Sequence, residues 1–238
     1  MKRISLLTAF SIMTMLSIAQ SRVINDKNAQ TRDVKGFHGI HVSGGIDLYL
    51  SQGTEAVAIS ANDLDVRDHI KTVVENGILK IYLDNRNGFH WNWHGLKMRA
   101  YVSAQALDQL NASGGSDITV DGGIKSDKLD VDLSGGSDFK GKLTVNELSF
   151  DQSGGSDVDI TGTVTNLTIE ASGGSDFAGY DLVTDNCRIT ASGGSDAHLT
   201  VNKELSANAS GGSDINYKGN GVIKQMKSSG SSSISKRG

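Results

Sequence analysis

One five-residue phrase, Ser-Gly-Gly-Ser-Asp, constrains this chain more than any other feature of its sequence. It stands at Ser113–Asp117, Ser134–Asp138, Ser153–Asp157, Ser172–Asp176, Ser192–Asp196 and Ser210–Asp214. The first serines recur after 21, 19, 19, 20 and 18 residues, and a degraded copy, Ser-Gly-Ser-Ser-Ser, follows 19 residues later at Ser229–Ser233. An early variant, Ser-Gly-Gly-Ile-Asp, lies at Ser43–Asp47. A repeat of about 20 residues is typical of a solenoid, in which each repeat contacts only its neighbours.

Apolar residues alternate with polar ones on both sides of the phrase. Three residues before it stand Leu110, Val131, Phe150, Ile169, Ile189, Ala207 and Met226. Directly after it stand Ile118, Phe139, Val158, Phe177, Ala197, Ile215 and Ile234. A third apolar position recurs later in the repeat, at Ile124, Val145, Val164 and Val183. Alternation with a period of two predicts short strands that each turn one face inward.

These strands predict an all-β fold, a single-stranded parallel β-helix with coils of about 19 residues. A lone coil cannot bury its inward face, whereas coils stacked at about 4.8 Å can pair each strand with the strands above and below. Helical repeats are disfavoured because the 3.6-residue period is missing. A propeller is disfavoured because one blade needs about 40 residues.

The phrase itself predicts a sharp corner. Glycine suits a backbone that bends with positive φ, and serine hydroxyls can bond to backbone groups nearby. The predicted corner residues are Gly44, Gly45, Asp47, Gly114, Gly115, Asp117, Gly135, Gly136, Asp138, Gly154, Gly155, Asp157, Gly173, Gly174, Asp176, Gly193, Gly194, Asp196, Gly211, Gly212 and Asp214.

The aspartates of the six intact phrases should line up along one edge, and we call them the Asp column: Asp117, Asp138, Asp157, Asp176, Asp196 and Asp214. Carboxylates about 5 Å apart repel one another by on the order of 1 kcal/mol even in water. Either each carboxylate accepts backbone N–H bonds within its own corner, or Ca²⁺ binds along the column. The first explanation is favoured, because the phrase lacks the third glycine and the nine-residue spacing of calcium-binding rolls, so no cofactor is predicted.

The remaining chain divides into segments of different character. Lys2 and Arg3 precede a largely apolar run that ends in small residues at Ala19, which predicts a secretory signal, with an uncleaved anchor as the alternative. The mature chain is then expected to be exported, to the periplasm, the outer surface or the medium, without a transmembrane segment. The predicted segments are a signal peptide (1–19), a polar lead-in (20–34), an irregular first part of the β-helix (35–112) with a hairpin loop (84–95), the regular β-helix (113–233) and a basic tail (234–238).

The loop at 84–95 holds both tryptophans of the chain. Alternation places Trp91 and Trp93 on one face and His90 and His94 on the other. These four residues are the candidate ligand-binding residues, as an aromatic platform for a sugar or a protein partner. The alternative is a loop folded back over apolar surface at the edge of the solenoid. Two histidines without a third ligand do not predict a metal site.

Charge is distributed unevenly along the chain. From Ser113 to Asp214 there are 17 acidic and 6 basic residues, whereas from Ile215 to Gly238 there are no acidic and five basic ones. The acidic repeats argue against a nucleic-acid partner. The basic end could cap the last coil, contact an acidic neighbour or simply be solvated. The single Cys187 excludes an intrachain disulfide and falls on an inward position.

An ordered set of short motifs carries a family resemblance. It comprises Phe37, the run from Ile40 through Val42 and Gly44-Gly45-Ile46-Asp47-Leu48, Leu79-x-Ile81, Tyr101-Val102, Leu107-x-x-Leu110 and the serial Ser-Gly phrases. Over about residues 35–235 the chain resembles the head GIN domain family of auto-transporter adhesins in Gram-negative bacteria, especially Bacteroidetes, with Asp47 replacing the Asn of Gly-Ile-Asn. The resemblance implies a right-handed parallel β-helix of the pectin-lyase type, an adhesin role and no established catalytic residues.

Three functions follow from these observations. The favoured one is a non-enzymatic, cell-surface or secreted adhesion module that binds a surface glycan or protein. The second is a structural, envelope-associated protein that self-assembles into homo-oligomers through open strand edges. The third is a polysaccharide-active enzyme, which would need clustered acids with a general base or acid. No catalytic residue is predicted, because the aspartates form a regular column with few bases nearby.

Overall fold

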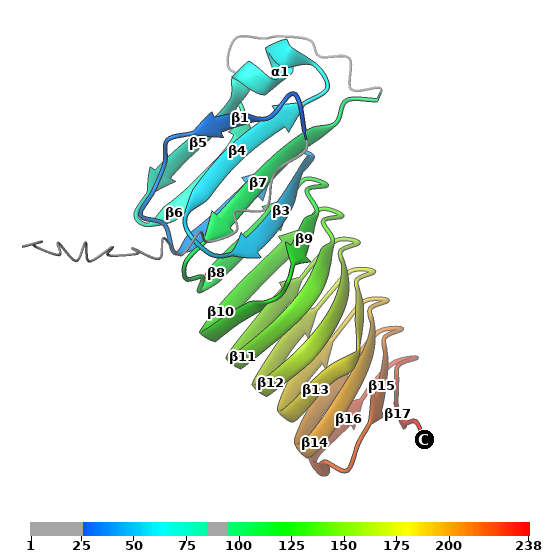
Figure 1. Cartoon of the computed structure of the whole chain (residues 1–238). Coiled ribbons are helices and arrows are strands. Elements are labelled where there is room, and N and C mark those ends of the chain that lie inside the picture. Colours follow the sequence, from blue (N-terminus) through cyan, green and yellow to red (C-terminus); the bar gives the residue numbers. More distant parts are fainter. Residues whose placement is uncertain (1–25, 85–94) are drawn as a thin grey trace, which may run out of the picture.

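Parallel pairing between strands one repeat apart confirms the predicted all-β solenoid, which the computed structural model describes for residues 26–84 and 95–238 (Figure 1). The first strands are β1 (Gln30–Arg32), β2 (Gly39–Ser43), β3 (Ile46–Gln52), β4 (Ala56–Ala61), β5 (Ile70–Glu75), β6 (Ile78–Leu83), β7 (Met98–Ala104), β8 (Gln109–Ser113) and β9 (Ile118–Asp121). They are followed by β10 (Ile124–Ser134), β11 (Phe139–Gln152), β12 (Asp157–Ala171), β13 (Asp176–Ala191), β14 (Asp196–Ala209), β15 (Asp214–Lys218), β16 (Val222–Ser228) and β17 (Ser233–Lys236). The helix α1 (Leu64–His69) connects β4 to β5.

Each regular coil has two corners. In β11, Phe139, Leu143 and Val145 face the core, and after the next two residues inward positions resume at Leu148 and Phe150. The two residues between, 146 and 147, are both exposed, so the alternation changes phase there. The second corner is therefore a bend without glycine, and the coil closes at the Ser-Gly-Gly-Ser-Asp corner.

The predicted inward columns form the core. The residues three before the phrase are fully buried from Leu110 to Ala207, and those directly after it are fully buried from Ile118 to Ile215. Among the inward rings, Phe150 packs edge-on against both Phe139 and Phe177, with ring centroids 5.5 Å apart in each pair. Edge-to-face packing of this kind adds to the burial of apolar area in stabilising a core.

The third apolar position differs from its prediction. Ile124 pairs with Leu143, and Val145 pairs with Val164, so these residues form two columns rather than one. Val183 points outward with 44% exposure, and Thr184 is buried in its place. An irregularity in the pairing of β12 with β13, between Asp159 and Gly162, inserts one residue into β13 and accompanies the change of face. A one-residue offset moves every following side chain to the opposite face.

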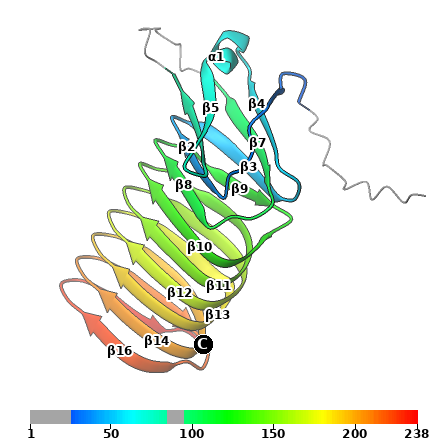
Figure 2. The same ribbon diagram turned by 90° about the vertical axis from the view of Figure 1, so that its left-hand side faces the viewer.

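The first coils are not stacked in chain order. β2 and β3 pair in parallel with β8 and β9 on one side and with β6 and β7 on the other. The coil formed by β2 and β3 therefore lies between a later coil and the regular stack. Beyond it, β4 pairs antiparallel with β7, β5 with β6, and β1 with β4, and these strands cover the N-terminal end of the rod (Figures 1 and 2).

The strands that flank the predicted hairpin loop at 84–95 lie side by side with strands of the neighbouring coil. The flanking strands β6 and β7 pair in parallel with β2 and β3, as two halves of one coil, and not with each other. Residues 84–97 thus connect β6 to β7, just as Gly44 and Gly45 connect β2 to β3 in the neighbouring coil. Residues 85–94 lie outside the described part of the chain.

At the opposite end, β16 pairs with β14, and β17 pairs with β15. β17 covers Ser233–Lys236, so most of the predicted basic tail belongs to the last coil. Within the described residues, no strand pairs with the far side of β16 or β17. Of these residues, none belongs to a helix long and apolar enough to cross a membrane.

Candidate functional site

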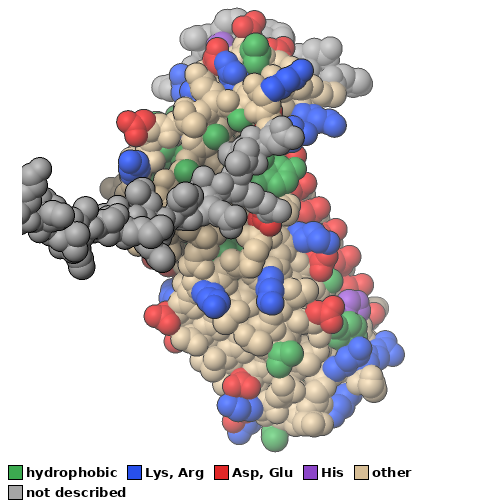
Figure 3. Space-filling view, in the orientation of Figure 1, with side chains coloured by type: hydrophobic (Ala, Val, Ile, Leu, Met, Phe, Trp, Pro, Cys, Tyr) green, Lys and Arg blue, Asp and Glu red, His purple; other side chains and the backbone are tan. Residues whose placement is uncertain are grey.

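The Asp column lies in register, as predicted. Asp157 pairs with Asp176, Asp176 with Asp196, and Asp196 with Asp214 along the parallel ladders. In Figure 3, acidic side chains gather along the right-hand edge of the rod, where the corner loops of Figure 1 project. The corners thus produce one continuous line of carboxylates.

The hydrogen bonds of these carboxylates run between coils, which corrects the expectation that they stay within one corner. Asp117 Oδ1 accepts the backbone N–H of Asp138 at 3.1 Å, and Asp138 Oδ1 accepts that of Asp157 at 3.1 Å. Asp196 Oδ1 accepts the N–H of Asp214 at 3.2 Å. Each bond partly offsets the repulsion between neighbours, because the N–H dipole favours the charged form of the carboxylate. The column therefore joins successive coils.

Burial raises the pKa of both Asp117 and Asp157, and neighbouring aspartates raise it further. Burial and the Asp117 carboxylate likewise raise the pKa of Asp47, against the opposing effect of Arg99 and Lys97. At neutral pH these ionised carboxylates therefore lower the stability of the folded protein, and their N–H bonds offset this effect only in part.

The second serine of the phrase forms a buried column beneath the aspartates. Ser156, Ser175, Ser195 and Ser213 are fully buried. Each hydroxyl donates to the carbonyl of the first serine of its own phrase at 2.9–3.0 Å. Ser232 keeps the same bond at 2.7 Å in the degraded copy. These bonds hold the corner shape from which the aspartates project.

Two stacked tyrosines lie beside the N-terminal end of the Asp column, two residues further along their strands than the aspartate position. Tyr49 of β3 and Tyr101 of β7 stack with ring centroids 5.4 Å apart, and Tyr49 is 39% exposed. Tyr101 Oη donates to Asp26 Oδ2 at 2.9 Å, and Arg99 Nη1 lies 3.6 Å from the same oxygen. Arg99 pairs in register with Asp47. The tyrosine pair is therefore held rigidly beside a cation and a carboxylate.

A second aromatic group lies on the same outward side near the other end of the rod. The rings of Tyr180 and His198 stack with centroids 4.9 Å apart, and Lys218 Nζ lies 4.2 Å from the centre of the Tyr180 ring. We define the Asp face as the Asp column together with these flanking residues, namely Asp47, Tyr49, Arg99, Tyr101, Tyr180, His198 and Lys218. Aromatic and charged side chains on a flat, rigid surface suit recognition of a large ligand.

The remaining predicted residues fall elsewhere. Trp91, Trp93, His90 and His94 lie outside the described residues. Cys187 is buried in the core as predicted, and burial raises the pKa of its thiol to about 12. In residues 26–84 and 95–238, no three His, Cys, Asp or Glu side chains are grouped so that they could hold a metal ion.

One shallow hollow of about 470 Å³ lies beside the turn after β3, lined by Lys35, Gln52, Gly53, Thr54, Glu55 and Gln105. Two of its polar side chains bond within the protein. Gln52 Nε2 donates to the Lys125 carbonyl at 2.9 Å, and Glu55 Oε2 accepts the Gly36 N–H at 3.0 Å. These two side chains are thus engaged, and none of the described residues that line the hollow is aromatic, so the Asp face remains the better candidate.

A family model described as "Putative auto-transporter adhesin, head GIN domain" matches residues 36–221. The chain belongs to this family. Head GIN domain membership confirms the resemblance seen in the sequence. No curated protein matches the chain.

Solved structures share the fold of this head GIN domain. A putative adhesin from Bacteroides fragilis is 22% identical, with a TM-score of 0.77, and the match covers 89% of this chain and 98% of that one. A putative lipid binding protein from Parabacteroides distasonis is 20% identical, with a TM-score of 0.65 and coverage of 90% and 98%. A putative adhesin from Parabacteroides merdae is 16% identical, with a TM-score of 0.65 and coverage of 88% and 95%. The family description and these names support a binding or adhesion role, and none of them names a catalytic activity.

Sequence reasoning missed the Tyr49–Tyr101 pair, although a signal for it was present. Tyr49 stands between the inward residues Leu48 and Leu50, and Tyr101 stands between the inward residues Ala100 and Val102. Alternation therefore marks both tyrosines as outward-facing. The stacking itself depends on the pairing of β3 with β7, which brings together residues 52 positions apart.

Proposed function

We propose that this head GIN domain is a non-enzymatic, exported adhesion module whose Asp face binds a glycan or protein on a surface. The observation that supports this most is the exposed Tyr49–Tyr101 stack beside Arg99, at the end of the line of carboxylates. A stacked aromatic pair offers a flat apolar surface to a sugar ring or an apolar side chain. Arg99 and the carboxylates would give that contact polar and charged specificity.

The rigidity of the rod also supports adhesion. Neighbouring coils hold the Asp face in one arrangement, so little conformational entropy is lost when an extended ligand binds along it. The strand spacing of about 4.8 Å sets the distance between successive carboxylates. A repetitive ligand, such as a polysaccharide, could therefore contact several coils at once.

Binding to arrays of bacterial and host glycans and of matrix proteins tests the proposal. The Tyr49→Ala variant should lose at least about tenfold in affinity for the ligand found, since buried interface aromatics commonly contribute more than 1 kcal/mol. Leu64→Ala is the matched control, because Leu64 is an exposed apolar residue on α1, away from the Asp face. Equal binding by both variants, or no ligand across the arrays, would contradict the proposal.

The segment with both tryptophans belongs to the same proposal. Trp91, Trp93, His90 and His94 stand between β6 and β7, and β7 also carries Arg99 and Tyr101. We expect the Trp91→Ala/Trp93→Ala variant to weaken binding of the same ligand. Retained binding in this variant but not in Tyr49→Ala would confine the site to the Asp face.

The enzymatic alternative is tested on the same samples. Turnover of an anionic polysaccharide, abolished by a single Asp→Asn change in the Asp column, would replace adhesion with catalysis. We expect no turnover, because the column carboxylates that accept N–H bonds are engaged in joining coils.

A further inference from the structure

The last coil of the rod leaves one strand edge without a partner among the described residues. β16 pairs with β14 on one side only, at the end of the stack farthest from α1 (Figure 2). An edge strand presents backbone N–H and C=O groups that can pair with another strand. By contrast, β4, β5 and β1 cover the opposite end of the rod.

Apolar side chains are exposed along this edge. Val222, Ile223 and Met226 are 62%, 38% and 42% exposed. In the preceding coil, Leu205 and Ala207 occupy the positions paired with Ile223 and Met226, and both are fully buried. A further level of strand would cover Ile223 and Met226 as the last coil covers their counterparts.

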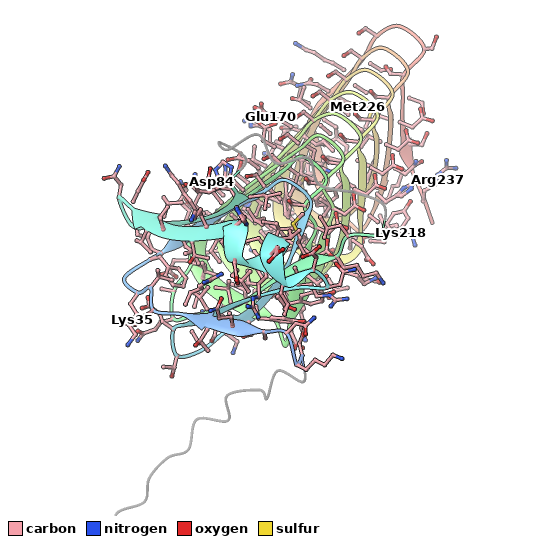
Figure 4. All side chains as sticks on the ribbon, turned by 90° about the horizontal axis from the view of Figure 1, so that it is seen from above. Lys35, Asp84, Glu170, Lys218, Met226 and Arg237 are labelled. Atoms are coloured by element: carbon pink, nitrogen blue, oxygen red, sulfur yellow. The ribbon has the colours of Figure 1, made fainter. Side chains whose placement is uncertain are left out.

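The charge around this edge has one sign. From Ile215 to Gly238 the chain carries Lys218, Lys224, Lys227, Lys236 and Arg237 and no acidic residue. Lys227, which lies on β16, is exposed. Lys224 and Lys227 lie on β16 together with Met226, and Figure 4 shows Lys218 and Arg237 on a different side of the rod from Met226, so basic residues lie on more than one side of the last coil.

The rod itself shows how such a lysine joins one level to the next. Lys140 Nζ lies 2.5 Å from Asp159 Oδ2, Lys203 Nζ lies 2.8 Å from Asp185 Oδ2, and Lys224 Nζ lies 3.0 Å from Glu204 Oε1. In each pair the two residues belong to neighbouring coils. A strand added beyond β16 could repeat this arrangement if it carried carboxylates.

We propose that β16 is a docking edge for an extended, acidic segment of a partner protein, which adds to the rod as its next strand. Backbone pairing with β16 would supply affinity, apolar residues of the segment would cover Ile223 and Met226, and one of its carboxylates would pair with Lys227 of β16. A second copy of this chain fits less well at the same edge, because two such edges would bring five basic residues against five.

The test uses the full chain and three soluble peptides of about ten residues, the length of one strand. One alternates Val and Glu, one alternates Val and Lys, and one is a shuffled form of the first without alternation. We expect the Val-Glu peptide to bind in calorimetry, the other two to bind at least tenfold more weakly, and added salt to weaken the interaction. Equal binding of all three peptides would overturn the proposal.

Matched charge reversals locate the site. Lys227→Glu on β16 should weaken binding of the Val-Glu peptide at least tenfold, whereas Lys142→Glu, at an exposed lysine on β11, should leave the binding unchanged. Circular dichroism checks that the fold persists, and Met226→Ser provides a second variant at the edge without a charge change. Retained peptide binding in both edge variants would overturn the proposal. So would a dimer in light scattering that Lys227→Glu disrupts, or binding of vesicles with anionic lipid in place of the peptide.

Discussion

At the scale of single residues, the two glycines of a late corner have different requirements. Gly173 has φ of +82°, and a Cβ there would lie 2.5 Å from the Gly154 carbonyl oxygen. Gly174 has no positive φ, and a Cβ there would meet nothing within 4 Å. The first glycine is thus fixed by both backbone conformation and the close approach of the neighbouring coil, and the second is fixed by neither.

We therefore expect Gly173→Ala to lower the free energy of unfolding by about 2 kcal/mol or more, because left-handed backbone alone costs an alanine about 1–2 kcal/mol. Gly174→Ala should be neutral or stabilise by up to about 1 kcal/mol, since alanine restricts the unfolded chain. Denaturant unfolding of both variants measures the difference. Equal destabilisation would mean that the corners do not hold the described geometry.

The Asp column predicts an unusual dependence on pH. Because the pKa of Asp157 is raised in the folded protein above its ordinary value of 3.8, the folded state holds this proton to higher pH than the unfolded state does. Ionised Asp157 therefore costs stability at neutral pH, and the cost disappears as pH falls through the raised pKa toward 3.8. Asp157→Asn should stabilise the protein at pH 7 by about 0.2–1 kcal/mol, the range of exposed charge pairs. Melting curves from pH 7 to pH 4 should show this advantage shrinking, and a constant advantage would contradict the assignment.

Calcium along the Asp column can be tested on the same variant. The carboxylates accept backbone N–H bonds from the next coil, so the column does not need a cation to be formed. We expect millimolar Ca²⁺ to leave the melting temperature unchanged within the effect of equal ionic strength from NaCl. A rise specific to Ca²⁺ that Asp157→Asn abolishes would show instead that the column is a calcium site.

At the scale of strands, local alternation predicted which residues face inward but not where the alternation breaks. Ile169 and Ile189 follow the repeat and are buried as predicted. Val183 was misplaced because one extra residue enters β13 where it pairs with β12, opposite Asp159–Gly162, and no local alternation shows on which strand position this falls. For the same reason, the sequence did not show that β2 and β3 lie between β6–β7 and β8–β9.

Strands at the two ends of the rod should differ in their protection from hydrogen exchange. β12 is paired on both sides, whereas β16 is paired on one side and most of its residues are exposed. Opening β16 thus breaks one ladder and exposes little new apolar surface, so its amides should exchange at least about tenfold faster than those of β12. Exchange measured by mass spectrometry or NMR on the free protein tests this expectation. Equal protection of β16 and β12 would indicate a further partner for β16, such as a second copy of the chain.

At the scale of the whole molecule, the repeat predicted the rod but only part of the candidate site. The Asp column was predictable, because each phrase places one carboxylate per coil. The Tyr49–Tyr101 pair was not, because it arises where the chain folds out of order at the N-terminal end. A solenoid converts a sequence repeat into a surface directly, and its irregular end coils require knowledge of long-range pairing.

The removal of one complete coil tests whether the rod is a linear stack. Deleting residues 135–153, which are 19 residues, joins Ser134 to Gly154 and restores the corner phrase. Val131 would then meet Ile169, and Leu133 would meet Ala171, as inward residues of matching columns. Because stability in a stack is a sum over repeats and their interfaces, this variant should keep its strand content and melt cooperatively a few degrees lower.

Deleting ten residues, 143–152, is the matched control. It removes half a coil, so Phe139 and the corner phrase that follows would no longer meet their counterparts above and below. This shorter deletion should abolish cooperative melting, although it removes fewer residues than the full coil. Circular dichroism and thermal melting of the two variants decide the matter, since a globular domain with one indivisible core would tolerate the smaller deletion better than the larger one.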